Sequence, residues 1–105
     1  MYTMVNVNDL IFDWDKNKND QLKKSRSVCF EDAVNVIETK GFIEKRDHPN
    51  KKRYPNQKII LVLIKDYVYV IPCVEDESRI FFKTIFASRK ETKKYLKDNS
   101  KKHEN

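Results

Sequence analysis

Three extended runs follow one another in the second half of the chain with almost no residues between them. Residues 57–64, 67–75 and 79–86 are rich in β-branched and aromatic side chains, and two or three residues connect them. Connections this short join neighbouring antiparallel strands, because the chain has no room to cross the sheet. This region therefore predicts an antiparallel meander, and it constrains the fold more than any other feature.

The side-chain pattern of these runs indicates how the sheet is covered. The first two runs are apolar on both faces, which is typical of a sheet covered on each side at its centre. Pro72 has no amide hydrogen to donate, so it indicates a bulge or an edge-facing position. In the third run, alternation puts Phe82, Thr84 and Phe86 on one face and Lys83 on the other.

One strand and two helices are predicted before the meander. Leu10 to Asp15 reads as the first strand, and Asp15 can cap a polar helix over residues 16–26. A second helix over residues 28–41 has apolar residues at offsets of three, four and seven. The only glycine, Gly41, stands at its end, where a residue with positive φ is expected.

The remaining segments complete an α+β fold. Residues 42–56 contain two turn-rich stretches and predict a long basic loop with room for one extended stretch. Ser88, with Glu91 three residues later, predicts a capping box that starts a last helix running to about Asp98. The expected order is β-α-α-β-β-β-α, an antiparallel meander flanked by helices, in one domain over residues 1–98 with a flexible basic tail over residues 99–105.

The basic residues are concentrated in two segments. The net charge of the chain is +6, of which residues 44–58 contribute +4 and residues 89–105 another +4, while the rest sums to −2. Clustered Lys and Arg indicate a polyanion-binding surface, because phosphate contacts release condensed counterions. A merely soluble, lysine-rich surface is the alternative that charge alone leaves open.

Several other classes of protein are not indicated. The longest apolar run, residues 59–64, is far shorter than the roughly 20 residues of a membrane span. The first residues lack the basic and apolar pattern of a secretory signal, so a cytoplasmic location is expected. Cys29 and Cys73 have no partner spacing for a metal and are expected to be reduced, buried thiols. No metal or other cofactor is expected.

A set of short motifs resembles the BrnT-like toxins in order and approximate spacing. The set covers Phe12 to Leu96, nearly the whole chain, and each motif alone is weak. Its members are Phe12-Asp-Trp-Asp-x-x-Lys18, Phe30-Glu-Asp-Ala33, His48-Pro-Asn50, Tyr54-Pro-Asn-Gln57, Tyr67-Val-Tyr-Val-Ile-Pro72, Phe82-Lys-Thr-Ile85 and Ser88-Arg-Lys90.

The resemblance implies a RelE-like fold and a bacterial type II toxin that cleaves RNA without a metal and so inhibits translation. It implies a cognate antitoxin as partner, and contact with operator DNA only through the antitoxin complex. One departure concerns a segment that in the family is usually Lys-His-Gly, or an Arg-Gly variant, and that here is Ser25-Arg26-Ser27. Arg26 can replace the charge of that histidine but not its proton transfer near neutral pH.

Five residues are candidates for catalysis. Metal-free RNA cleavage needs a base, an acid and a cation at the phosphate. His48 is the one histidine expected in an ordered region, with a local backbone hydrogen bond as its alternative role. The resemblance adds Arg89, Lys83, Arg26 and Lys18, of which Arg89 is the first choice for phosphate and a salt bridge its alternative role.

Further candidates concern RNA binding. Lys90, Lys93 and Arg53 supply charge, and Tyr54 can stack on a base or pin its loop. A non-catalytic nucleic-acid-binding or co-repressor module, such as a decayed toxin, is the alternative function, which the scarcity of histidine favours. A plain interaction protein is a third possibility, and it would require basic segments that do not face one side.

Overall fold

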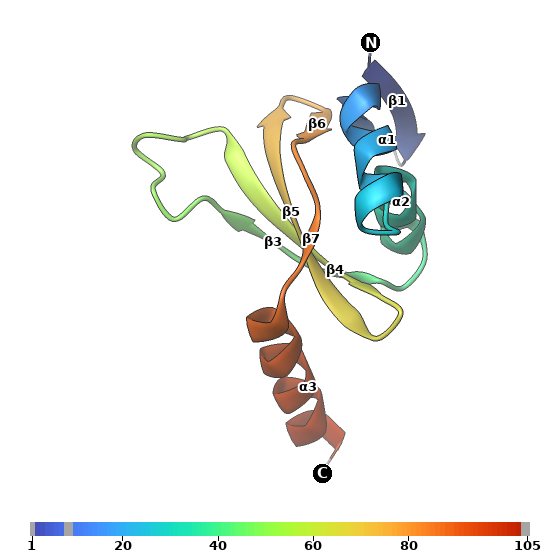
Figure 1. Ribbon diagram of the computed structural model, residues 1–105. Helices are drawn as coiled ribbons and strands as arrows, with labels where there is room; N and C mark the ends of the chain where they lie inside the picture. Colours follow the sequence, from blue (N-terminus) through green and yellow to red (C-terminus); the bar gives the residue numbers. More distant parts are fainter. Residues whose placement is uncertain (1, 8–9, 104–105) are drawn as a thin grey trace.

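The computed structural model describes residues 2–7 and 10–103 and has an α+β architecture (Figure 1). Within these residues the helices are α1 (Lys16–Ser25), α2 (Phe30–Glu38) and α3 (Arg89–His103). The strands are β1 (Tyr2–Val7), β2 (Leu10–Asp15), β3 (Phe42–Asp47), β4 (Gln57–Ile64), β5 (Tyr67–Asp76), β6 (Arg79–Phe82) and β7 (Phe86–Ala87). They form one open, mixed sheet in the order β1-β2-β6-β5-β4-β3, and β7 pairs with β5 beyond the end of β6.

The predicted meander is confirmed. Strand β5 pairs antiparallel with β4 from Tyr67 to Val74 and with β6 on its other side. The β4–β5 connection is a two-residue turn in which Lys65 and Asp66 have φ values of 51° and 67°. Positive φ at both central residues matches the right-handed twist of the strands that the turn connects.

The predicted element order is incomplete. Strand β1 was not expected, and β3 occupies the start of the predicted basic loop. Strand β2 is parallel to β6, with Phe12 opposite Ile80, so the sheet is mixed rather than purely antiparallel. In this pair, Arg79 Nη1 lies 3.8 Å from a carboxylate oxygen of the buried Asp13. The β2–β6 contact joins segments more than sixty residues apart, a distance over which local patterns carry no pairing information.

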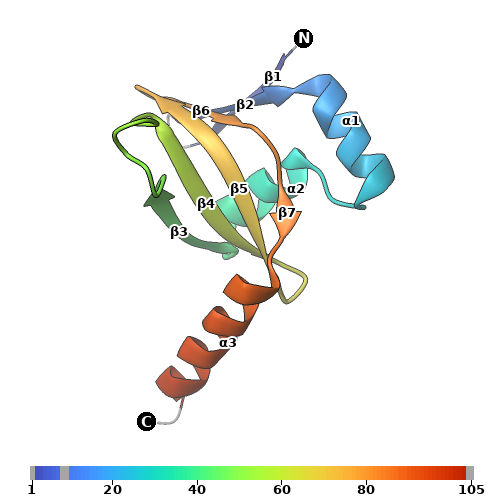
Figure 2. The same cartoon turned by 60° about the vertical axis from the view of Figure 1, so that its left-hand side comes forward.

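Helices α1 and α2 cover one face of the sheet (Figures 1 and 2). As predicted, the Asp15 side chain accepts a hydrogen bond from the backbone N–H of Asn17, 2.8 Å away, and Leu22 is buried. The buried Asn19 side chain accepts from the N–H of Phe30 at 2.8 Å and donates to Glu31 at 2.6 Å. Asn19 thus satisfies a first-turn amide of α2, which holds the two helices together.

The core on this face is built around an aromatic cluster from three elements. Trp14, Phe30 and Phe82 have ring centroids 5.7–6.0 Å apart, and all three side chains are essentially inaccessible to solvent. Between the two helices, Ser27 has a φ of 55°, in the left-handed region that favours glycine.

The expectation of a positive φ at Gly41 is wrong, because the φ of Gly41 is not positive. Helix α2 ends at a C-cap on Thr39 instead. A Cβ at residue 41 would clash with Val36 Cβ and lie 2.8 Å from the carbonyl oxygen of Leu63. Gly41 is therefore required by a close approach between the end of α2 and β4, rather than by backbone conformation.

Helix α3 packs on the opposite face of the sheet through Tyr95, which contacts a small cluster of Leu61, Val68 and Val70. It continues past the predicted end at Asp98 to His103, so the proposed tail over residues 99–105 is in part helical, and its last two residues lie outside the described part of the chain. None of the helices in the described residues is long and apolar enough to cross a bilayer.

Replacing Gly41 with alanine tests the close approach. We expect Gly41→Ala to lower the free energy of unfolding by about 1–3 kcal/mol, because the added methyl group forces α2 away from β4. Urea denaturation followed by circular dichroism measures the change, and the neighbouring exposed Lys40→Ala is the control. Equal midpoints for the two variants would contradict the steric explanation.

Candidate nucleic-acid interface

The segment between β6 and α3 contains a one-residue bulge beside Pro72. Cys73 pairs with Phe82, and Val70 pairs with Phe86. Between these two pairs β5 advances by three residues and the facing segment by four, so the facing segment contains one extra residue. The N–H of Lys83 donates to the carbonyl oxygen of Pro72 at 2.8 Å. Of the two explanations that the sequence offered for Pro72, a bulge or an edge-facing position, the bulge is present, and Lys83 within it is exposed to solvent.

The bulge reverses the expected alternation beyond Lys83. Ile85 is fully buried in the core that contains Phe82, whereas Phe86 is 39% exposed. The prediction that Phe86 shares the face of Phe82 is therefore wrong. The physical reason is the extra residue, which exchanges the inward and outward positions of everything that follows.

Arg26 reaches this segment from the end of α1. Its Nη1 atom donates to the carbonyl oxygen of Ile85 over 2.7 Å. Arg26 thus contacts the chain two residues from Lys83, although Arg26 and Lys83 are 57 positions apart in the sequence. Lys18 lies two turns earlier in α1 and is half-buried.

The same segment leads directly into α3. The N–H of Ser88 donates to the carbonyl oxygen of Val68 at 2.9 Å, and Ser88 Oγ accepts from the N–H of Glu91 at 3.1 Å. Ser88 is therefore the predicted N-cap, but the Glu91 side chain does not complete the capping box, because it binds Arg46. Arg89 and Lys90 in the first turn, and Lys93 in the next, are exposed.

We define the 83–93 ridge as the exposed cations of this segment together with Arg26. Its members are Arg26, Lys83, Arg89, Lys90 and Lys93. The helix dipole at the start of α3 adds to the attraction of this ridge for anions.

His48 does not join the 83–93 ridge. The loop that contains it begins with a hydrogen bond from the N–H of His48 to the Gln57 carbonyl, and the N–H of Glu75 donates to the Asn56 carbonyl at 2.8 Å. Glu75 and Val68 are seven residues apart in β5, roughly 23 Å at about 3.3 Å per residue. The loop and the start of α3 accordingly lie at opposite ends of the sheet (Figures 1 and 2).

His48 instead has local partners. Its Nδ1 accepts a hydrogen bond from the N–H of Asn50 at 3.0 Å, and its ring centroid is 4.6 Å from that of Tyr54. The guanidinium carbon of Arg53 lies 5.4 Å from the centroid of the Tyr54 ring. These contacts correspond to the structural roles that the sequence left open for both residues, a turn histidine and a tyrosine that pins its loop.

Many of the cations in residues 44–58 are paired with carboxylates. Lys51 and Lys58 both contact Asp47. Their hydrogen bonds lower the pKa of the Asp47 carboxyl to about 2, and the bond from Lys51 has the larger effect. Lys45 Nζ lies 2.6 Å from a carboxylate oxygen of Glu75. The charge of this segment therefore overstates the number of cations that are available to a ligand.

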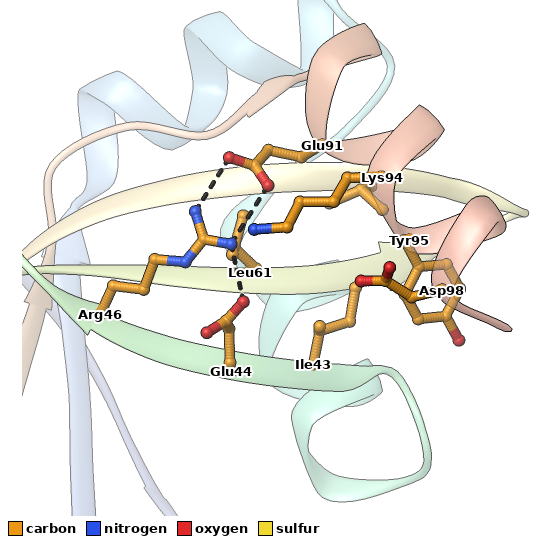
Figure 3. A pocket seen from close by; sticks show the side chains of 9 residues that line it. Ile43, Glu44, Arg46, Leu61, Glu91, Lys94, Tyr95 and Asp98 are labelled. Carbon is orange, nitrogen blue, oxygen red and sulfur yellow. Dashed lines mark hydrogen bonds and ion pairs between the residues drawn. The ribbon is translucent and has the colours of Figure 1, made fainter. Parts of the chain in front are cut away.

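Arg46, which was not among the candidates predicted from the sequence, forms the most extensive ion pairs of this segment. It donates to both carboxylate oxygens of Glu91 at 2.9 and 3.2 Å and to Glu44 at 2.7 Å (Figure 3). The bond from Arg46 lowers the pKa of Glu44, and the bond to Glu44 raises the pKa of Arg46. These ion pairs attach α3 to β3. They also line a pocket of about 50 Å³ between the two elements.

Neither the two cysteines nor a metal-binding cluster supplies another chemical centre in the described residues. Burial raises the pKa of Cys29 to about 11 and that of Cys73 to about 12, so neither thiol is an activated nucleophile near neutral pH. Both cysteines are unpaired. Within the same residues, no three His, Cys, Asp or Glu side chains are grouped to bind a metal ion.

The attachment of α3 can be tested at Thr92, which is 7% exposed. Its Oγ1 accepts from the N–H of Val68 at 2.9 Å and donates to the Ser88 carbonyl at 2.6 Å. Thr92→Val keeps the shape but leaves the buried Val68 amide unpaired, so we expect it to lower the free energy of unfolding by about 1–3 kcal/mol. Urea denaturation measures this loss.

Thr39→Val is the matched control, since Thr39 is exposed at the end of α2 and also bonds backbone carbonyls. We expect it to change stability by at most about 0.5 kcal/mol. Losses of the same size in both variants would show that the Thr92 hydrogen bond does not stabilise the docked helix.

Comparisons with protein-family models, curated proteins and solved structures give no match to this chain. The likeness to BrnT-like toxins therefore depends on the motifs of the sequence alone.

Proposed function

We propose that this chain binds RNA through phosphate contacts made by the 83–93 ridge. The observation that carries the proposal is the hydrogen bond from Arg26 to the Ile85 carbonyl, because it brings a cation from the first helix to the segment that contains Lys83 and leads to Arg89. Arginine presents a planar fork of donors that matches the phosphate oxygens, and lysine adds a mobile charge.

Phosphate binding without cleavage is the activity that this geometry supports best. Cleavage without a metal needs a group that transfers protons close to the bound phosphate. His48 lies near the other end of β5, and its Nδ1 already accepts the N–H of Asn50. His48 therefore lies away from the cations of the ridge, and His103, the other histidine of the chain, ends α3 ten residues after Lys93.

The second candidate is a metal-independent ribonuclease with a RelE-like fold, the toxin of a type II toxin–antitoxin system. The ordered motifs from Phe12 to Leu96 favour it. In this case the protein acts on RNA in the cytoplasm, a cognate antitoxin neutralises it, and the complex of the two binds operator DNA. Both candidates use the same cationic ridge, so they differ in the fate of the bound RNA.

Binding and salt dependence test the ridge. We expect Arg89→Ala and Lys83→Ala each to weaken RNA binding by about 5–10-fold in 0.1 M salt, because each loses a phosphate contact. Each variant should also reduce the slope of log K against log salt concentration by about 0.7, the value per phosphate of a single strand. Fluorescence anisotropy with a labelled RNA measures both quantities.

Lys40→Ala is the control for the loss of one positive charge, since Lys40 is exposed near the end of α2. Equal effects of the three substitutions would overturn the assignment of the ridge. Incubation of the purified protein with RNA in EDTA distinguishes the two candidates. A cleaved product that disappears with Arg89→Ala would replace the first candidate by the second.

A further inference from the structure

The loop over residues 48–56 is a compact, internally braced structure. The N–H of Arg53 donates to Asn50 Oδ1 at 3.2 Å, and the N–H of Tyr54 donates to the Asn50 carbonyl at 3.0 Å. The N–H of Gln57 donates to the Tyr54 carbonyl oxygen at 3.2 Å. Together with the contact between the His48 and Tyr54 rings, these bonds give the loop one defined conformation.

This loop presents two cations outward. Lys52 and Arg53 are exposed, and neither has a carboxylate partner in the part of the chain that the structure describes. Arg53 is held against the face of Tyr54, which limits the conformations of its guanidinium group. By contrast, Lys51 and Lys58 on either side both contact Asp47, whose single negative charge offsets one of theirs. The loop therefore offers a small, preorganised site for an anion.

The position of the loop relative to the ridge determines what kind of anion can use both. Hydrogen bonds fix Asn56 at Glu75 and Ser88 at Val68, so roughly 23 Å of strand β5 separates the loop from the start of α3, where Arg89 lies. Lys83 lies between the two, beside Pro72, about 10 Å along β5 from Glu75. A mononucleotide cannot reach from the loop to the start of α3, whereas a polynucleotide carries phosphates at every step. In a duplex, 23 Å corresponds to roughly seven base pairs at about 3.4 Å each.

We propose that Lys52 and Arg53 form a second phosphate-binding site, so that the protein holds one RNA chain at two points and selects polynucleotides over short oligonucleotides. This inference rests on the proposed RNA binding by the 83–93 ridge. Simultaneous contact at both sites raises affinity without a new interface, because the second contact becomes intramolecular once the first is made.

Affinity as a function of RNA length tests the proposal. The probes are unstructured, labelled oligouridylates of 4, 8, 12, 16 and 24 nucleotides, titrated with the full chain at constant salt. We expect affinity to increase at least about tenfold over the length at which one RNA first reaches both sites, and then to level off. The double variant Lys52→Ala/Arg53→Ala should lose this increase for long RNAs and bind the shortest RNA within about threefold of the wild type.

The matched control is Lys16→Ala/Lys40→Ala, which removes the same charge from two exposed residues outside both sites. If the loop variant and the control bind the 24-nucleotide RNA equally, the second site is refuted while the proposed function stands. If the wild-type protein binds none of the RNAs at low salt, the proposed function fails and this inference fails with it. Circular dichroism verifies that both variants are folded.

Discussion

Strand β5 positions the other parts of the molecule. It pairs with β4 from Tyr67 to Val74, and on its other side it pairs first with β6 and then with β7. Its Val68 backbone binds the start of α3 through Ser88 and Thr92, and its Glu75 amide binds the end of the basic loop. Because an extended, paired strand is stiff along its length, the two cationic groups are held at a constant separation.

The carboxylates of the chain decide which cations remain for a ligand. Glu75 and Glu91, which lie outside residues 44–58, neutralise cations that the net charge of that segment counts as available. Surface ion pairs of this kind stabilise the fold only weakly. Their main consequence is spatial, since they leave exposed positive charge on the 83–93 ridge and at the tip of the 48–56 loop. Arg46 differs from the others because its two bonds to Glu91 also attach α3 to β3.

The candidate site was predictable in its residue types but not in its arrangement. The S-x-x-E pattern located the start of α3, and the N-cap hydrogen bond of Ser88 is present. The role of Glu91 was not predictable, since its partner Arg46 lies 45 residues away. The same applies to Arg26, whose contact with Ile85 spans 59 residues. His48 shows the converse, because its local partners occupy it at a distance from the ridge.

Local sequence patterns predicted the bounds of β4, the two-residue turn at Lys65 and Asp66 and the caps at Asp15 and Ser88, and they offered a bulge as one of two explanations for Pro72. Each depends on the stereochemistry of a few neighbouring residues. The folded sheet alone reveals the parallel β2–β6 pairing, the need for Gly41 and the distance in space between the basic loop and the start of α3. These depend on contacts between distant segments, whose geometry exists only once the whole sheet has formed.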